Sequence, residues 1–434
     1  MTPETVGLIG IVLLVILLFS RMPIAFVMIL VGIVGVFLLK DFDVATGIAK
    51  TVPYSTVAAY NMSVVPLFVL MGEFAFSAGL TQGLYEAVYK WIGHHRGGLA
   101  LATVGACGLF AAISGSSPAT AGAMGRVSLP EMERYNYDIK LATASVAAGG
   151  TLGILIPPSV PMVIYGVLTE QPIGKLLIAG IVPGILLMLL YMATVYTLAR
   201  RNPAIAPRGP KFTYAERFAA LKGIGPILVI FLLTIGGIWL GWFTPTEGAA
   251  VGAFLTFAYA LLSGHLTFQK FLHVLIETGK ITAMIFGIFV GAMLFGYFLS
   301  MAQLPQHTAD FLSSLPVPPI VIMAMIMILY LILGCFMDSL AMILLTIPIF
   351  FPVAMKLGYD PIWFGVIIVS VCELGLITPP VGMNLYIVKG IAQPNVKLGT
   401  IYAGIYPFVL AILLFEVLLY IFPQIVLLPI AGMK

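Results

Sequence analysis

The stretch Ser114-Gly-Ser-Ser-Pro-Ala-Thr120 interrupts an otherwise apolar run, residues 98–133, close to its middle. Pro118 cannot donate a backbone hydrogen bond inside a helix, and a Ser-Gly-Ser-Ser sequence favours a turn. A second apolar run, 316–352, is interrupted in the same way by Gly334-Cys-Phe-Met-Asp-Ser339. Irregular backbone at membrane depth is tolerated only where protein or a water-filled cavity surrounds it. Both runs are therefore predicted to be re-entrant helical hairpins whose tips reach the middle of a bilayer.

The composition places the rest of the chain in the membrane as well. Of 434 residues, 61% are hydrophobic and 9% are charged, against about 45–50% and about 25% in soluble domains. Since a bilayer core needs about 20 apolar residues per helix, we expect an all-α polytopic membrane protein. Its predicted spans are 5–20, 23–39, 52–78, 138–168, 174–199, 223–242, 245–263, 272–300, 361–390 and 398–425.

Several function classes do not fit this sequence. The formal net charge is only +4 and the basic residues are spread over short loops, which argues against nucleic-acid binding. Three cysteines in apolar segments do not make a disulfide framework, and the five histidines show no HExxH-type metal spacing. His94-His95 lies in a basic loop and is interpreted as an interfacial pair. We expect no enzyme activity, no cofactor and no metal other than a coupling ion.

An internal repeat organises the chain. Shifting the sequence by 222 positions without gaps places Ser117 on Ser339, Tyr137-Asp138 on Tyr359-Asp360, and Pro157-Pro158 on Pro379-Pro380. The offset predicts a first repeat at 1–199, a basic linker at 200–222 and a second repeat at 223–434.

The charges predict how the repeats are oriented. If each hairpin enters and leaves the membrane on one side, each repeat crosses five times, and an odd number of crossings inverts the second repeat relative to the first. This topology puts 16 of the 21 basic residues on one face. Because the basic face of a membrane protein is cytoplasmic, both termini are predicted to lie outside.

Paired hairpins and paired broken helices in inverted halves are typical of secondary-transporter sites. Free N–H groups at half-helix N-termini suit a carboxylate, whereas unwound carbonyls suit Na⁺. Ser116-Ser117-Pro118 is predicted to be an N-cap with proline at the first helical position, where the second arm of hairpin one begins. Asp338-Ser339 is predicted to be the equivalent cap in hairpin two. Capping alone is one interpretation, but an ionisable group at membrane depth favours an ion or substrate role for Asp338.

The two Pro-Pro breaks, Gly153–Ser159 and Gly375–Gly382, free several carbonyls each. A single Pro-Pro would more simply mark a kink, whereas the pairing at one offset favours a binding site.

Other polar residues fit structural roles better. Thr244-Pro-Thr-Glu247 is a capping box that begins a helix. For Glu73 and Glu373, which lie in apolar spans, structural pairing and an ion or proton role both remain open.

Five motifs together resemble a known family: GSSPATAGAMGRVSLPEM (115–132), GGTLGILIPPSVPMVIYG (149–166), TPTEGAAVGA (244–253), CFMDSLAMILLTIPIFFPV (335–353) and LGLITPPVGMNLYI (374–387). They are similar to the large membrane (M) subunit of tripartite ATP-independent periplasmic (TRAP) transporters. The resemblance covers essentially the whole chain. It implies a multi-pass subunit of the bacterial inner membrane that works with a small membrane (Q) subunit and a periplasmic substrate-binding (P) protein.

The resemblance also implies Na⁺-coupled uptake of an organic anion, such as a C4-dicarboxylate or sialic acid, by an elevator movement. Because no small-subunit segment precedes Met1, we expect that subunit on a separate chain. The implied sodium-binding residues are Ser116, Ser117 and Gly153 in one site, and Gly334, Asp338, Ser339 and Thr378 in the other. The implied substrate-binding residues are Thr120, Pro158, Pro380 and Asn384.

Two other hypotheses compete with a subunit of a tripartite transporter. A stand-alone, ion-coupled carboxylate carrier would share the helix breaks but would need no binding protein. A membrane-embedded enzyme or scaffold is disfavoured, because no His/Asp/Glu cluster has catalytic spacing and no GxxxxGK[ST] loop for nucleotide hydrolysis is present.

Overall fold

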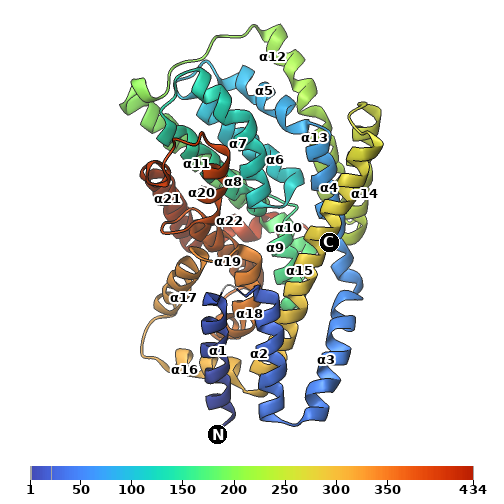
Figure 1. Cartoon of the computed structure of the whole chain (residues 1–434). Coiled ribbons are helices and arrows are strands. Elements are labelled where there is room, and N and C mark those ends of the chain that lie inside the picture. The colour runs from blue at the N-terminus through green and yellow to red at the C-terminus, as the bar shows by residue number, and fades with distance from the viewer. Residues whose placement is uncertain (1, 21, 434) are drawn as a thin grey trace.

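The fold is helical from end to end in the computed structural model, which describes residues 2–20 and 22–433 (Figure 1). Two of the basic residues counted above, Arg21 and Lys434, lie outside the described residues. The α-helices are α1 (Pro3–Phe19), α2 (Ile24–Leu39), α3 (Phe42–Val57), α4 (Val64–Ser77), α5 (Leu80–Ile92), α6 (Gly98–Ser114), α7 (Ser117–Arg134), α8 (Ile139–Leu155), α9 (Val160–Leu168), α10 (Ile173–Ala179), α11 (Ile181–Arg201), α12 (Tyr214–Ala220), α13 (Gly225–Trp239), α14 (Pro245–Leu262), α15 (Phe268–Met301), α16 (Leu304–Ser314), α17 (Pro319–Gly334), α18 (Ser339–Lys356), α19 (Pro361–Leu376), α20 (Met383–Ile391), α21 (Leu398–Ile421) and α22 (Gln424–Leu427). Short 3₁₀ turns are η1 (Tyr60–Ser63), η2 (Pro203–Ile205), η3 (Leu221–Gly223) and η4 (Leu428–Ile430).

Membrane character follows from helix length and apolarity. Among the described residues, seven helices are long and apolar enough to cross a bilayer, or eight if the bent α12–α13 pair counts as one span. The predicted spans 5–20 and 23–39 are realised as α1 and α2, which have only 17 and 16 residues. The result is a polytopic all-α membrane protein, as predicted.

One group of helices surrounds the long helix α15. Helix α2 packs along α15, and α14 packs along α4. The α2–α15 approach is close because a Cβ at Gly32 would lie 2.7 Å from the backbone carbonyl carbon of Leu294. Figure 1 shows α1, α2 and α3 gathered at the N-terminal end of the molecule, opposite α12.

Each of the two predicted hairpin segments contains a pair of packed helices, while their re-entrant course in a membrane stays a prediction. Helices α6 and α7 form the first, and α17 and α18 form the second. Both predicted broken helices are also present: α8 and α9 are separated by residues 156–159, and α19 and α20 by 377–382. The peptide bonds Pro157–Pro158 and Pro379–Pro380 are cis.

Hairpins and broken helices interlock. The second arm of hairpin one, α7, packs against α8 and also against α20 from the other broken helix. The second arm of hairpin two, α18, packs against α19 and also against α9. Each hairpin therefore contacts both broken helices.

The element boundaries follow the offset of 222 residues. Helix α7 begins at Ser117 and ends at Arg134, and α18 begins at Ser339 and ends at Lys356. The inversion of the two halves across a membrane stays a prediction.

The predicted span 52–78 is wrong in its boundaries. The structure begins α3 ten residues earlier, at Phe42, where the Asp41 carboxylate accepts the Val44 N–H at 2.8 Å. The chain then turns through η1 before α4 begins at Val64. Helices α5 and α16 were not predicted, because their mixture of polar and apolar residues falls below the apolarity of a span.

Candidate functional site

The tip of hairpin one is a two-residue turn held by serine and threonine hydroxyls. Helix α6 ends at Ser114, and Gly115 takes φ +64°. Ser116 caps α7 through its Oγ, which accepts the Ala119 N–H at 3.3 Å. The Ser116 carbonyl accepts hydrogen bonds from the Ser114 hydroxyl at 3.1 Å and the Thr120 hydroxyl at 2.8 Å. The predicted cap is confirmed.

This tip lies directly against the first broken helix. A Cβ at Gly153 would stand 2.5 Å from the Ser116 carbonyl oxygen and 2.6 Å from the Thr120 Oγ1. A Cβ at Gly115 would stand 3.1 Å from the Pro158 carbonyl oxygen. Only glycine permits such approaches. The structure therefore brings together Ser116, Thr120, Gly153 and Pro158.

The side chain of Ser117 does not face the Ser116–Gly153 contact but lies in a buried polar cluster with residues of α19 and α20. Its Oγ lies 3.0 Å from the Gly150 carbonyl and 2.5 Å from Oε2 of Glu373 on α19. The Asn384 amide on α20 donates to the same Oγ at 2.9 Å. All three side chains are fully buried. The second oxygen of Glu373, Oε1, and Oδ1 of Asn384 have no hydrogen-bond partner in the part of the chain that the structure describes.

The tip of hairpin two is capped by a carboxylate. Oδ1 of Asp338 accepts the N–H groups of Leu340 at 2.9 Å and Ala341 at 3.1 Å. Two charge-assisted bonds from one helix end are stabilising, because a carboxylate suits a helix N-terminus. The predicted Asp338 cap is confirmed.

The second tip also lies against its broken helix. A Cβ at Gly375 would stand 2.6 Å from the Cα of Gly334, so α17 and α19 meet backbone to backbone. The Gly382 N–H donates to the Cys335 carbonyl at 3.2 Å, tying the break to the tip. The Thr378 hydroxyl donates to the carbonyl of Leu374 at 2.6 Å, within its own helix end.

The predicted residues of the second site are less tightly joined than those of the first. Gly334 touches the broken helix, but no side-chain hydrogen bond of the described residues joins Asp338 or Ser339 to Thr378. Pro380 offers its carbonyl to the Tyr402 hydroxyl of α21. The side-chain amide of Asn384 donates to the Ser117 Oγ at 2.9 Å and to the Ala147 carbonyl at 3.4 Å, and its role at the substrate stays a prediction.

Sequence reasoning missed the Ser117–Glu373–Asn384 cluster. A carboxylate in an apolar span signals that a partner must exist, but it does not say which one. The partner lies 256 residues away, so only the three-dimensional packing of hairpin one on α19 and α20 identifies it. Structural pairing of Glu373, one of the two open interpretations, is now observed.

The helix ends supply the electrostatics of the site. Helices α7, α9, α18 and α20 begin at the tips or breaks, whereas α6, α8, α17 and α19 end there. N-termini carry about half a positive charge and C-termini about half a negative charge. The region therefore offers N–H groups to an anion and carbonyls to a cation.

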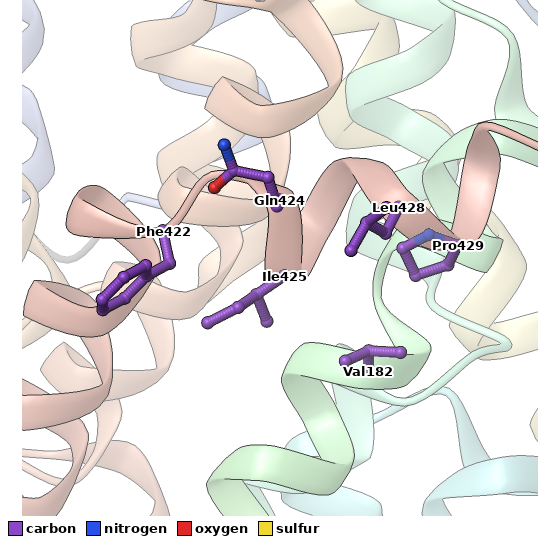
Figure 2. A pocket seen from close by; sticks show the side chains of 6 residues that line it. All are labelled: Val182, Phe422, Gln424, Ile425, Leu428 and Pro429. Atoms are coloured by element: carbon purple, nitrogen blue, oxygen red, sulfur yellow. The ribbon is translucent and has the colours of Figure 1, made fainter.

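A hollow between α11 and the C-terminal residues is a weaker candidate for the functional site. It has a volume of about 600 Å³ and is lined by Val182 of α11 and, near the C-terminus, by Phe422, Gln424, Ile425, Leu428 and Pro429 (Figure 2). Its lining is apolar apart from Gln424. None of the predicted site residues lines it.

Comparison with known proteins identifies the family. Residues 11–425 match the family described as the tripartite ATP-independent periplasmic transporter, DctM component. The C4-dicarboxylate TRAP transporter large permease protein DctM of Pseudomonas aeruginosa is 39% identical, over 86% of each chain. The sialic acid TRAP transporter large permease protein SiaM of Vibrio cholerae is 34% identical, over 95% of each chain.

A solved structure shares the fold. The Alcanivorax borkumensis YdaH transporter superposes with a TM-score of 0.65 at 18% identity, covering 89% of this chain and 90% of that one. The relatives are transporter permeases and not enzymes. The chain is a large permease and belongs to the DctM component family of tripartite ATP-independent periplasmic transporters.

Proposed function

We propose that this chain is the permease subunit of a transporter that takes up an organic carboxylate together with Na⁺. The observation that carries the proposal is the meeting of two capped hairpin tips with two broken helices. That arrangement gathers four helix N-termini and four helix C-termini in one region. Such half-helix ends bind carboxylates and Na⁺ in secondary transporters.

The first sodium site is proposed between the tip of hairpin one and α8. The close approach of Gly153 to the Ser116 carbonyl supports it, because backbone oxygens are hard ligands of the kind that Na⁺ takes. The side chain of Ser117 is held by Glu373, Gly150 and Asn384. In this site, therefore, Ser117 would contribute through its backbone, and the Ser116 carbonyl would bind Na⁺ by exchanging the hydroxyl donors of Ser114 and Thr120.

The second sodium site is proposed between the tip of hairpin two and α19. Asp338 uses Oδ1 for both backbone amides, which leaves Oδ2 for a cation. Gly334, Ser339 and Thr378 surround the same tip and break. A cation there would neutralise Asp338 and hold the tip against its broken helix.

The substrate carboxylate is proposed to lie between the two tips, near Thr120, Pro158, Pro380 and Asn384. With both tips ordered by sodium, the N–H groups at the helix starts complete an anion site. The hairpins and broken helices would then slide together, as an elevator, against a scaffold built from the first two helices of each inverted repeat. Substrate classes named for relatives, C4-dicarboxylate and sialic acid, are the first candidates.

The proposed partners follow from the tripartite family. A small membrane (Q) subunit and a periplasmic binding (P) protein would complete the transporter in the bacterial inner membrane. The binding protein would deliver the substrate and select it.

Uptake of labelled acids into proteoliposomes tests the proposal. The liposomes would contain this chain and its small subunit, with an inward Na⁺ gradient and purified binding protein each present or omitted. We expect uptake only when both are present. Unchanged uptake in sodium-free buffer with a proton gradient would overturn sodium coupling, and uptake without binding protein would favour a stand-alone carrier.

A further inference from the structure

A basic pocket beside the start of α6, at the other end of this helix from the tip of hairpin one, has no assigned role. It has a volume of about 410 Å³ and lies where the turn between α5 and α6 meets the end of α11 and the following linker. Four permanently charged side chains line it: Arg96, Arg200, Arg208 and Lys211. All lie on the face predicted to be cytoplasmic.

Backbone contacts fix these cations close together. Arg96 and Arg208 are directly bridged in antiparallel fashion. On either side, the Gly97 N–H donates to the Ala206 carbonyl at 3.3 Å and the Gly209 N–H donates to the Gly93 carbonyl at 3.0 Å. The fold itself, and not side-chain flexibility, therefore sets two arginines side by side.

No protein carboxylate compensates this charge. Across residues 2–20 and 22–433, none of the four basic side chains takes part in an ion pair. The two histidines at the pocket, His94 and His95, have ring centroids 4.1 Å apart. Burial, with the positive charges of His95, Arg217 and Lys211, lowers the pKa of His94. Like charges held together without a counter-ion are destabilising, so the pocket suits an anion.

An apolar surface leads into the pocket along α11. Its exposed residues recur at helical spacing as Leu189, Ala193, Tyr196 and Arg200, and the last two line the pocket. At 1.5 Å per residue, Leu189 lies about 16 Å from Arg200, which is on the order of one leaflet of a bilayer core. The same face continues to Val182, at the apolar hollow of Figure 2.

We propose that this pocket binds the phosphate of an acidic phospholipid, with one acyl chain lying on the exposed face of α11. Arginine forks bind phosphate oxygens in pairs, and basic pockets between membrane helices on the cytoplasmic side bind anionic headgroups. The continuous apolar surface distinguishes a lipid from a free phosphate, which would need no such path.

Native mass spectrometry of the transporter in neutral detergent tests this proposal. Phosphatidylglycerol would be titrated against phosphatidylcholine, with inorganic phosphate and glycerol phosphate as soluble competitors. The test variant is the triple substitution Arg96→Gln, Arg200→Gln, Arg208→Gln. The matched control removes the same charge from exposed basic residues on the same predicted face, by Arg134→Gln, Lys140→Gln and Lys222→Gln.

We expect phosphatidylglycerol to be retained by the wild type and by the control, and bound about 100-fold more weakly by the triple variant. Equal losses in both triple variants, or equal retention of phosphatidylcholine, would overturn the proposal. Binding of inorganic phosphate without retention of lipid would overturn the lipid assignment. If the triple variant does not fold, the single variants Arg200→Gln and Lys211→Gln give the same comparison.

Discussion

Replacing Gly153 with alanine places a methyl group between hairpin one and the first broken helix. The new Cβ would stand 2.5 Å from the Ser116 carbonyl oxygen, and contacts below 3.0 Å force a shift. To bring the distance between the new Cβ and the Ser116 carbonyl oxygen to 3.0–3.4 Å, the tip of hairpin one or helix α8 must move by about 0.5–0.9 Å. Since one neighbour is backbone, rotamer changes alone cannot relieve the clash.

The expected cost is about 1–3 kcal/mol of folding stability, the usual range for overpacking. A displacement approaching 1 Å at a binding geometry costs up to about 100-fold in function, so we expect Na⁺-driven uptake to fall about 10- to 100-fold. Sodium stabilises the protein that binds it. The rise of Tm on adding Na⁺ should therefore shrink in the variant.

Gly390→Ala is the matched control. Gly390 is also a helical glycine of the membrane region, but a Cβ there meets no heavy atom within 4 Å. Alanine should be neutral or stabilising by about 0.5–1 kcal/mol. If Gly153→Ala matches this control in Tm, sodium response and uptake, hairpin one does not close on α8 and the reasoning fails.

Three further substitutions separate the roles of the polar residues. Ser117→Ala should lower the free energy of unfolding by about 1–3 kcal/mol, because Glu373 and Asn384 lose a shared buried partner. An unchanged Tm would contradict that pairing. Asp338→Asn should keep part of the cap but weaken the sodium dependence of uptake about tenfold or more, and a sodium titration identical to that of the wild type would remove Asp338 from the ion site. Glu247→Ala should lose a capping box, about 0.5–2 kcal/mol of stability, while sodium dependence stays the same; a changed sodium dependence would give Glu247 a role beyond the helix start.

The sequence predicts the hairpins and the broken helices well, because proline and glycine act locally. Pro118 fits the first turn of α7, and the Pro157-Pro158 and Pro379-Pro380 pairs remove consecutive backbone donors at the two breaks. A single proline is not enough, since Pro348 and Pro352 lie inside α18. The two caps are equally local: they were predicted at Ser116-Ser117 and at Asp338-Ser339, and the structure places them at Ser116 and Asp338.

The sequence does not predict contacts set by packing. The direction of the Ser117 side chain depends on how α7 packs between α8, α19 and α20, and its partner Glu373 has no nearby signal in the chain. The amphipathic helices α5 and α16 were missed for a related reason: only one face of each is buried against other helices, so neither is apolar enough to be predicted as a span.

The most direct test of the central claim uses the cysteine at the tip of hairpin two. Cys335 is 6% exposed, while Cys107 and Cys372 have no exposed surface, so a thiol reagent should report on this tip alone, and Cys335→Ser checks that it does. The rate of labelling would be compared in Na⁺ and in K⁺. If sodium holds the tip against α19, Na⁺ should slow labelling several-fold in the wild type and have little effect in Asp338→Asn. Equal labelling rates in Na⁺ and K⁺ would contradict a cation site between the hairpin and the broken helix.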